Sequence, residues 1–179
     1  FILGHDFLIT THYGPLPALE NFAKIFETDL AHRHLSGEIH AGYLFVYIIT
    51  EVYGTILDNL DRINNQLKQT EKEIFAGQEN KMVGVLSTIN RNLLDLRWSL
   101  RPHQKLLVSL EPPAVRLWGN TFQHELAAVG GEFHKIWNMI ENNKDAFSNL
   151  WNTNNSLLTL KTNATIKVLT IISFLFLPL

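Results

Sequence analysis

A line of small polar residues near the end of the sequence has the spacing of one helix face. Its members follow in alternating steps of four and three residues: Asp145, Asn149, Asn152, Ser156, Thr159, Asn163, Ile166, Thr170, Ser173 and Leu177. Residues at this spacing share one face of an α-helix. Their amide and hydroxyl groups can bond to water or to the water shell of a cation. We call this set the polar stripe.

The polar stripe continues where the rest of the predicted helix becomes apolar. Residues 168–176 are all apolar except Thr170 and Ser173. Lipid-facing surfaces must be apolar because no water is present there to satisfy polar groups, whereas a face toward an aqueous pore stays polar. The alternative is an Asn-rich solvated face on a soluble helix, with Ser and Thr bonding back to their own backbone. Asn is a poor helix former, and so much of it in one helix favours the pore.

The apolar run that surrounds the end of the stripe is short for a membrane span. Val168–Leu179 has 12 residues, whereas a spanning helix needs about 20. The sequence is still apolar at its last residue and opens inside another apolar run at Phe1, so we expect a piece of a longer protein. Lys161 and Lys167 precede the run, which predicts that this side is cytoplasmic.

Other residues that could bind metals or catalyse reactions form weaker patterns. His32, His34 and His40 resemble a metal-binding cluster, but no carboxylate spacing supports them, and we interpret them as surface or capping residues. His124-Glu125 begins like a zinc-protease motif, but Ala128 stands where the second His is required. There is no cysteine and no Gly-rich phosphate loop. We therefore expect no enzyme activity.

Composition excludes several classes of protein. The chain has 179 residues, a net charge of −2, 46% hydrophobic residues and 18% charged residues. The apolar content is too high for a disordered chain. The near-neutral charge gives no basic surface for nucleic acid or for anionic lipid headgroups.

Hydrophobic periodicity predicts a mainly helical fold behind a short hairpin. Phe1–Leu3 and Phe7–Thr11 flank a Gly-His-Asp turn and predict two strands of a sheet. Apolar steps of three, four and seven predict helices over about 18–33, 38–75 and 81–110. Gly77 should end the second of these helices, and Pro102 should kink or break the third.

A linker and one long helix complete the prediction. Glu111-Pro112-Pro113 is interpreted as the linker. From about Thr121 to the end, one helix carries the polar stripe and also a second, apolar seam, which Gly130-Gly131 could interrupt. The seam is Phe122, Leu126, Val129, Phe133, Ile136, Ile140, Phe147, Leu150 and Leu157.

The block Thr162–Leu179 resembles the start of the first transmembrane helix of CorA-type magnesium transporters. The matching residues are Asn163, Lys167, Val168, Leu169, Thr170, Ile171, Ile172, Pro178 and Leu179. The hairpin and the long helices agree with that family in layout. The resemblance implies the last hairpin of a cytosolic α/β/α domain over 1–17, a cytosolic helical region over 18–113, a stalk helix over 114–165 and the start of the first transmembrane helix over 166–179.

The resemblance also implies a homopentamer in the cell membrane whose stalk helices surround an axial pore for magnesium, with cobalt or nickel also permitted. Asn163 matches the asparagine at the cytoplasmic mouth, and Asn152 and Thr159 match stalk positions that face the axis. Ile166 and Leu177 occupy positions where relatives often have Met. Leu169 matches the family's pore leucine, whereas the stripe selects its neighbour Thr170; Ser173 continues the lining.

One acidic residue by which the family senses magnesium has no direct match in this chain. The family senses the ion between protomers, partly through an acidic residue early in the stalk, and an ungapped alignment puts Ala128 there. Glu125 and Glu132 lie one turn to either side and are the candidate replacements. Two other functions stay open: zinc transport, because Arg101-Pro102-His103-Gln104 resembles the ZntB branch, and a soluble coiled-coil interaction protein.

Overall fold

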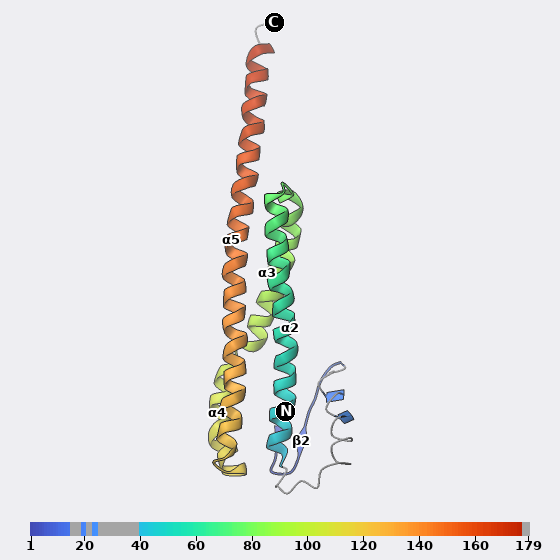
Figure 1. The fold of residues 1–179 in the computed structure, drawn as a ribbon, viewed down its shortest axis with the longest axis vertical. Helices are drawn as coiled ribbons and strands as arrows, with labels where there is room; N and C mark the ends of the chain where they lie inside the picture. The colour runs from blue at the N-terminus through green and yellow to red at the C-terminus, as the bar shows by residue number, and fades with distance from the viewer. Residues whose placement is uncertain (15–18, 21–22, 25–39, 177–179) are drawn as a thin grey trace. The chain divides into compact units, whose positions relative to one another are not determined.

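A computed structural model describes residues 1–14, 19–20, 23–24 and 40–176. The elements are β1 (Ile2–Leu3), β2 (Leu8–Ile9), α2 (Ala41–Phe75), α3 (Glu79–Leu100), α4 (His103–Trp118) and α5 (Phe122–Phe176) (Figure 1). The mainly helical fold with an initial hairpin is therefore confirmed. The helix predicted over about 18–33 lies almost entirely outside the described residues.

The chain forms two compact units, which share its long helices. The first unit contains Phe1–Asn59 and Trp98–Asn138, and the second contains Leu60–Arg97 and Met139–Leu179. The candidate stripe lies wholly within the second unit, so its surroundings are described from that unit alone.

The first unit holds the hairpin against the start of α2 and the end of α4. The strands pair antiparallel, with Ile2 opposite Ile9 and Leu3 opposite Leu8. The carbonyl oxygen of His5, in the turn, accepts hydrogen bonds from the Ala41 backbone N–H and from Trp118 Nε1, both at 3.1 Å. These two bonds attach the hairpin to the beginning of α2 and the end of α4. The apolar core beside it includes Phe45, Ile48, Tyr53, Ala114, Phe122, Leu126, Val129, Phe133 and Ile136.

The predicted break at Pro102 is confirmed, but the predicted linker is wrong. Pro102 precedes the first residue of α4, where its missing N–H costs no intrahelical bond, and the Leu106 N–H donates to its carbonyl oxygen at 3.1 Å. Helix α4 then continues through Pro112 and Pro113 to Trp118. Burial accounts for this continuation. Ala114 and Trp118 are buried and Trp118 bonds to the hairpin, so tertiary packing offsets the loss of two backbone donors.

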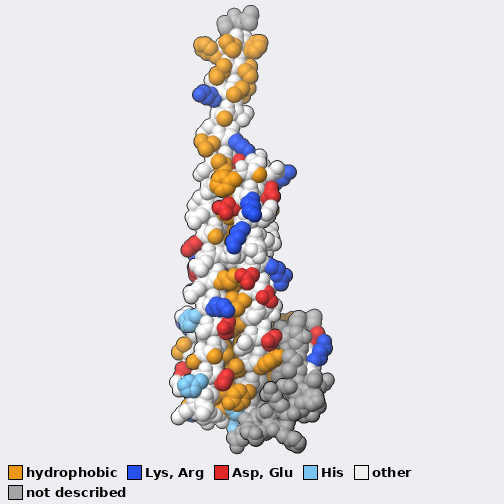
Figure 2. Space-filling model, viewed as in Figure 1, with side chains coloured by type: hydrophobic (Ala, Val, Ile, Leu, Met, Phe, Trp, Pro, Cys, Tyr) orange, Lys and Arg blue, Asp and Glu red, His pale blue; other side chains and the backbone are white. Residues whose placement is uncertain are grey.

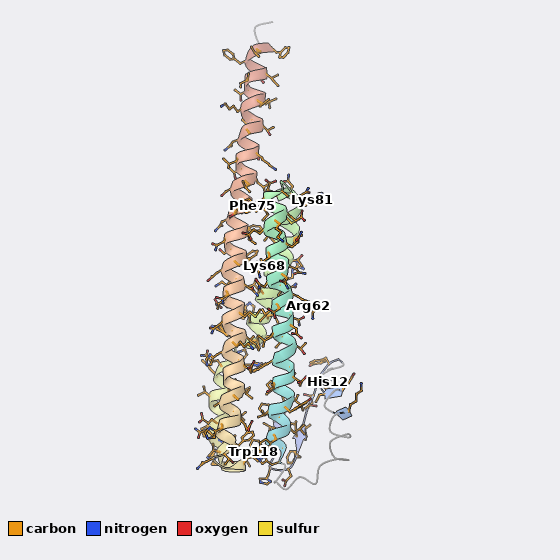
Figure 3. The ribbon with its side chains drawn as sticks, in the orientation of Figure 1. His12, Arg62, Lys68, Phe75, Lys81 and Trp118 are labelled. Carbon is orange, nitrogen blue, oxygen red and sulfur yellow. The ribbon has the colours of Figure 1, made fainter. Side chains whose placement is uncertain are left out.

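The second unit consists of segments of α2, α3 and α5. Helix α2 ends at a turn in which Gly77 has φ +86°, a left-handed conformation that favours glycine, as the sequence predicted. Phe75 and Lys81, labelled in Figure 3, stand on either side of this turn. The buried apolar residues of this unit are Leu60, Ile63, Leu67, Ile74, Leu86, Ile89, Leu93, Ile140 and Leu150.

Four polar contacts show whether these helices are parallel or antiparallel within the second unit. Asn143 Nδ2 donates to the Leu60 carbonyl oxygen at 3.1 Å, and Lys161 Nζ donates to that of Gly77 at 3.3 Å, so α2 and α5 run in the same direction. Arg97 pairs with Glu141 at 3.1 Å and Lys161 with Glu79 at 2.5 Å, so α3 runs the opposite way.

Candidate functional site

Helix α5 has a distinct bundle-facing side in the second unit. Ile140, Asn143, Leu150 and Asn154 are buried, and Lys161 reaches the turn after α2. Phe147 and Leu157 fill the same repeat and are half-buried. Together these positions recur in steps of three and four residues. They form the seam by which α5 packs against α2 and α3.

The polar stripe lies on the opposite side of α5. Each stripe residue from Asp145 to Asn163 stands two positions after a seam residue, and two residues rotate an α-helix by about 200°. Every described stripe residue, from Asp145 to Ser173, is exposed. A surface directed away from its own bundle, on a helix this polar, is available to line an aqueous space. Leu177 lies outside the described residues.

The hydroxyl groups of the stripe donate to their own helix. Ser156, Thr159, Thr170 and Ser173 each donate to the backbone carbonyl oxygen four residues earlier, at 2.8–2.9 Å. These are the bonds that the soluble-helix alternative expected, and they also suit a pore. Because each hydrogen is already used, the oxygen presents only its lone pairs outward. The water shell of a hydrated cation points its hydrogens outward, so a row of acceptors is complementary to it.

The charges around the stripe also suit a cation. Asp145 is the only charged member of the stripe. The Lys161 ammonium is held on the seam side by Glu79, whose side chain is 4% exposed. This hydrogen bond, more than the charge of Lys161, holds the pKa of the Glu79 carboxyl below its ordinary value. Lys161, two residues before Asn163, is therefore paired with a carboxylate and directed away from the stripe.

Beyond Asn163 the sides of α5 become apolar and remain exposed. Val168, Ile171, Phe174, Leu175 and Phe176 are between 52% and 82% exposed, and Figure 2 shows orange side chains gathered around this end of the helix. Among the described residues, α5 is the one helix long and apolar enough to cross a membrane, and none of its most apolar 18-residue window is buried. Leu169 and Thr170 are both exposed, so which of them faces the axis stays a prediction.

The two acidic candidates for metal binding do not form a site together. Glu125 and Glu132 are both half-buried, and Glu132 pairs with Lys135 at 3.7 Å. They are seven residues apart on one helix, about 10 Å, which is too far for both to ligate one cation. The described residues contain no group of three His or acidic side chains arranged to hold a metal. Any magnesium bound by Glu125 or Glu132 would need ligands from elsewhere.

Two polar residues inside the seam were not predicted from the sequence. Asn143 and Asn154 occupy seam positions that the apolar pattern skips, between Ile140 and Phe147 and between Leu150 and Leu157. The signal was present, because each gap is a step of seven with a polar residue at the expected midpoint. The Glu79–Lys161 pair had no sequence signal, since its members are far apart in the chain.

Comparisons of the sequence and of the fold with known proteins all match CorA proteins. The model of the family described as "CorA-like Mg2+ transporter protein" matches residues 1–179. The chain belongs to this CorA-like family. The family and the mainly helical layout that the resemblance implied are therefore confirmed.

Two relatives support the assignment. The chain is 27% identical over 166 residues to the "Cobalt/magnesium transport protein CorA" of Thermotoga maritima. The matched region covers 88% of this chain and 45% of that protein. The solved structure of the CorA magnesium transporter from Methanocaldococcus jannaschii matches 92% of the chain and 51% of its own, with a TM-score of 0.73 and 18% identity, which supports the fold. The chain thus spans about half the length of these CorA proteins.

Proposed function

We propose that this CorA-like chain supplies the stalk and part of the pore wall of a divalent-cation transporter, with magnesium as the first substrate. The observation that carries the proposal is the position of the polar stripe. It lies on the exposed side of α5, opposite the packed seam, and it extends into a segment whose other faces are apolar. Transport is not an enzymatic reaction, and none of the stripe residues has a catalytic role in this proposal.

The chemistry of the stripe fits a hydrated ion better than a bare one. Magnesium gives up its water slowly, so a pathway that bonds to the water shell avoids that cost. The amides of Asn149, Asn152 and Asn163 offer both donors and acceptors, and the back-bonded hydroxyls offer acceptors. In the proposed pore Ile166 and Leu177, which the sequence puts on the stripe, would interrupt this polar lining with apolar rings that oppose an ion when water is excluded; Leu169 would do the same if it faces the axis in place of Thr170.

A single stripe cannot enclose a pore, so the proposal includes self-association. Several copies of α5 around an axis, five in the arrangement expected of the family, would bring their stripes together and leave the apolar sides for lipid. In this proposal the stalk lies on the cytoplasmic side of the cell membrane, which the two lysines before the apolar run, Lys161 and Lys167, support by the positive-inside rule. A regulatory magnesium at Glu125 or Glu132 stays a prediction that requires ligands from another protomer or segment.

The test replaces Asn163 with Leu in the full-length protein and measures magnesium uptake into vesicles. The variant removes amide groups from the mouth and replaces them with bulky apolar ones. Several hydrogen bonds between these amides and the water shell of the arriving ion are lost, each worth about 0.5–1.5 kcal/mol. Because about 1.4 kcal/mol corresponds to a tenfold change in rate, we expect uptake to fall at least tenfold.

The matched control is Thr165→Leu. Thr165 is exposed, lies two residues after Asn163 on another face, and donates to the Lys161 carbonyl oxygen at 3.0 Å. Uptake should be nearly normal in this variant. Normal uptake by an assembled Asn163→Leu protein would remove Asn163 from the pathway. Zinc uptake that exceeds magnesium uptake in the unmodified protein would favour the ZntB-like alternative.

A further inference from the structure

Asn154 is the most unusual buried residue of the second unit. Its side chain is 0% exposed, and neither Nδ2 nor Oδ1 has a hydrogen-bond partner among the residues that the structure describes. Most buried polar groups in proteins are bonded, because an unpaired one gives up its bonds to water without replacement. An amide buried in this way makes the packing around it less stable than an apolar seam would be.

Asn143 provides a comparison within the same seam. It is also buried, at 4% exposed, but its Nδ2 donates to the Leu60 carbonyl oxygen at 3.1 Å. The two asparagines have the same chemistry, the same helix and the same face. They differ in that one amide is bonded to α2 and the other is not. The unpaired state is therefore specific to Asn154 and is not a general property of asparagines in this seam.

Two contacts of α5, one before Asn154 and one after it, show which residues of α2 and α3 lie at the same height along the bundle. The Asn143–Leu60 contact lies before it and the Lys161–Glu79 contact after it. Alignment of the helices on these contacts puts Thr70 of α2 and Leu86 of α3 at the level of Asn154. Both are buried, at 2% and 0% exposed. Asn154 therefore lies in a mixed layer, at the level of one buried polar residue, Thr70, and one buried apolar residue, Leu86.

A turn of α5 at this level would also move the polar stripe. Ser156 and Thr159 lie within the next two turns of the same unbroken helix, on the opposite side. Rotation that brings Asn154 toward a partner or toward water therefore rotates the stripe by the same angle. An unpaired amide on the seam favours such a rotation, because the amide gains a bond when the packed orientation is left.

We infer that Asn154 is a positioning residue that keeps the packed orientation of α5 only marginally favoured and so sets how readily the stripe turns. The inference rests on the proposed transport function for its consequence, but not for its physical basis. An apolar residue at this position should strengthen the packing of α5 on α2 and α3 and hold the stripe in one orientation.

The experiment compares Asn154→Leu with Asn143→Leu in the full-length protein. Leu has the same number of side-chain heavy atoms and the same branching as Asn. Asn154→Leu should raise the melting midpoint by about 2–4 °C, slow amide hydrogen exchange over 150–158 several-fold, and lower magnesium uptake about fivefold or more. Asn143→Leu should lower the melting midpoint, because the Leu60 carbonyl oxygen loses its bond. Asn154→Val introduces a smaller apolar side chain than Leu. It should therefore show these same three effects even where Leu is too large to fit.

Each contrary result overturns the inference in a different way. A lower melting midpoint in both Asn154 variants would mean that the amide is bonded in the native assembly. A higher midpoint with unchanged exchange and unchanged uptake would mean that the amide is unpaired without positioning α5. Failure of the proposed function is distinguishable, because the unmodified protein would then not take up magnesium, while melting and exchange would still report on Asn154.

Discussion

Tyr53 and His103 form a half-buried hydrogen bond in the first unit, at the first residue of α4. The Tyr53 hydroxyl donates to His103 Nδ1 at 2.9 Å, and the Phe133 ring lies near both rings. Burial raises the pKa of Tyr53 to about 12, so its hydroxyl keeps the proton that it donates. Burial lowers the pKa of His103, so its ring stays neutral and accepts. Protonation would turn His103 Nδ1 into a donor, so the Tyr53 hydroxyl could no longer donate to it.

This pair predicts a pH-dependent stability. Because the pKa of His103 is lower in the folded chain, the unfolded chain binds a proton first as the pH falls through about 6.5. Stability from this group is present above that pH and is lost below it. We expect the melting midpoint of the full-length protein to fall between about pH 7.5 and 5.5, and to fall less in His103→Gln. The control is His134→Gln, at an exposed histidine. An unchanged pH dependence in His103→Gln would contradict the role of the pair.

At the residue scale, the sequence predicted the stripe but not its electrostatic setting. Asn152, Thr159 and Asn163 were identified by spacing alone, because a helix places regular steps on one face whatever surrounds it. The partner of Lys161 could not be predicted, since Glu79 belongs to another helix and reaches it only after the chain folds. Asn143 and Asn154 were hidden because a search for apolar positions passes over polar ones.

At the element scale, helix periodicity was a reliable guide, whereas proline marked a break at Pro102 but not at Pro112 and Pro113. The breaks at Gly77 and Pro102 are local effects of backbone conformation and were predicted. Continuation of α4 through Pro112 and Pro113 depends on Trp118, which bonds to the hairpin at the other end of the chain. No local pattern contains that information.

Gly131 gives a prediction at the same scale. It lies inside α5, and a Cβ added there meets no atom within 4 Å. Alanine is favoured over glycine in a helix interior by about 0.5–1 kcal/mol. Gly131→Ala should therefore raise the free energy of unfolding by that amount, measured by urea titration of the full-length protein. Gly77→Ala is the opposite control, because φ +86° strains any residue with a Cβ. Destabilisation by Gly131→Ala would indicate that another chain approaches the helix backbone at this point.

At the scale of the whole molecule, the proposed pore depends on one geometric relation within the second unit. The seam of α5 packs against its own bundle, and the polar stripe is left facing outward. The sequence predicted both patterns and their common helix, and membership of the CorA-like family agrees with them. What the sequence of one chain cannot contain is the arrangement of several copies, which is where the proposed pore forms.

Cross-linking between copies is the most direct test of that relation. This sequence contains no cysteine, so single cysteines can be introduced without competing thiols from it. In the full-length protein in membranes, Asn152→Cys and Thr159→Cys should form inter-subunit cross-links readily, because the exposed stripe faces the axis in the proposed assembly. Leu150→Cys and Leu157→Cys, on the packed seam, should cross-link weakly. The reverse order, with the seam positions cross-linking faster, would contradict the account.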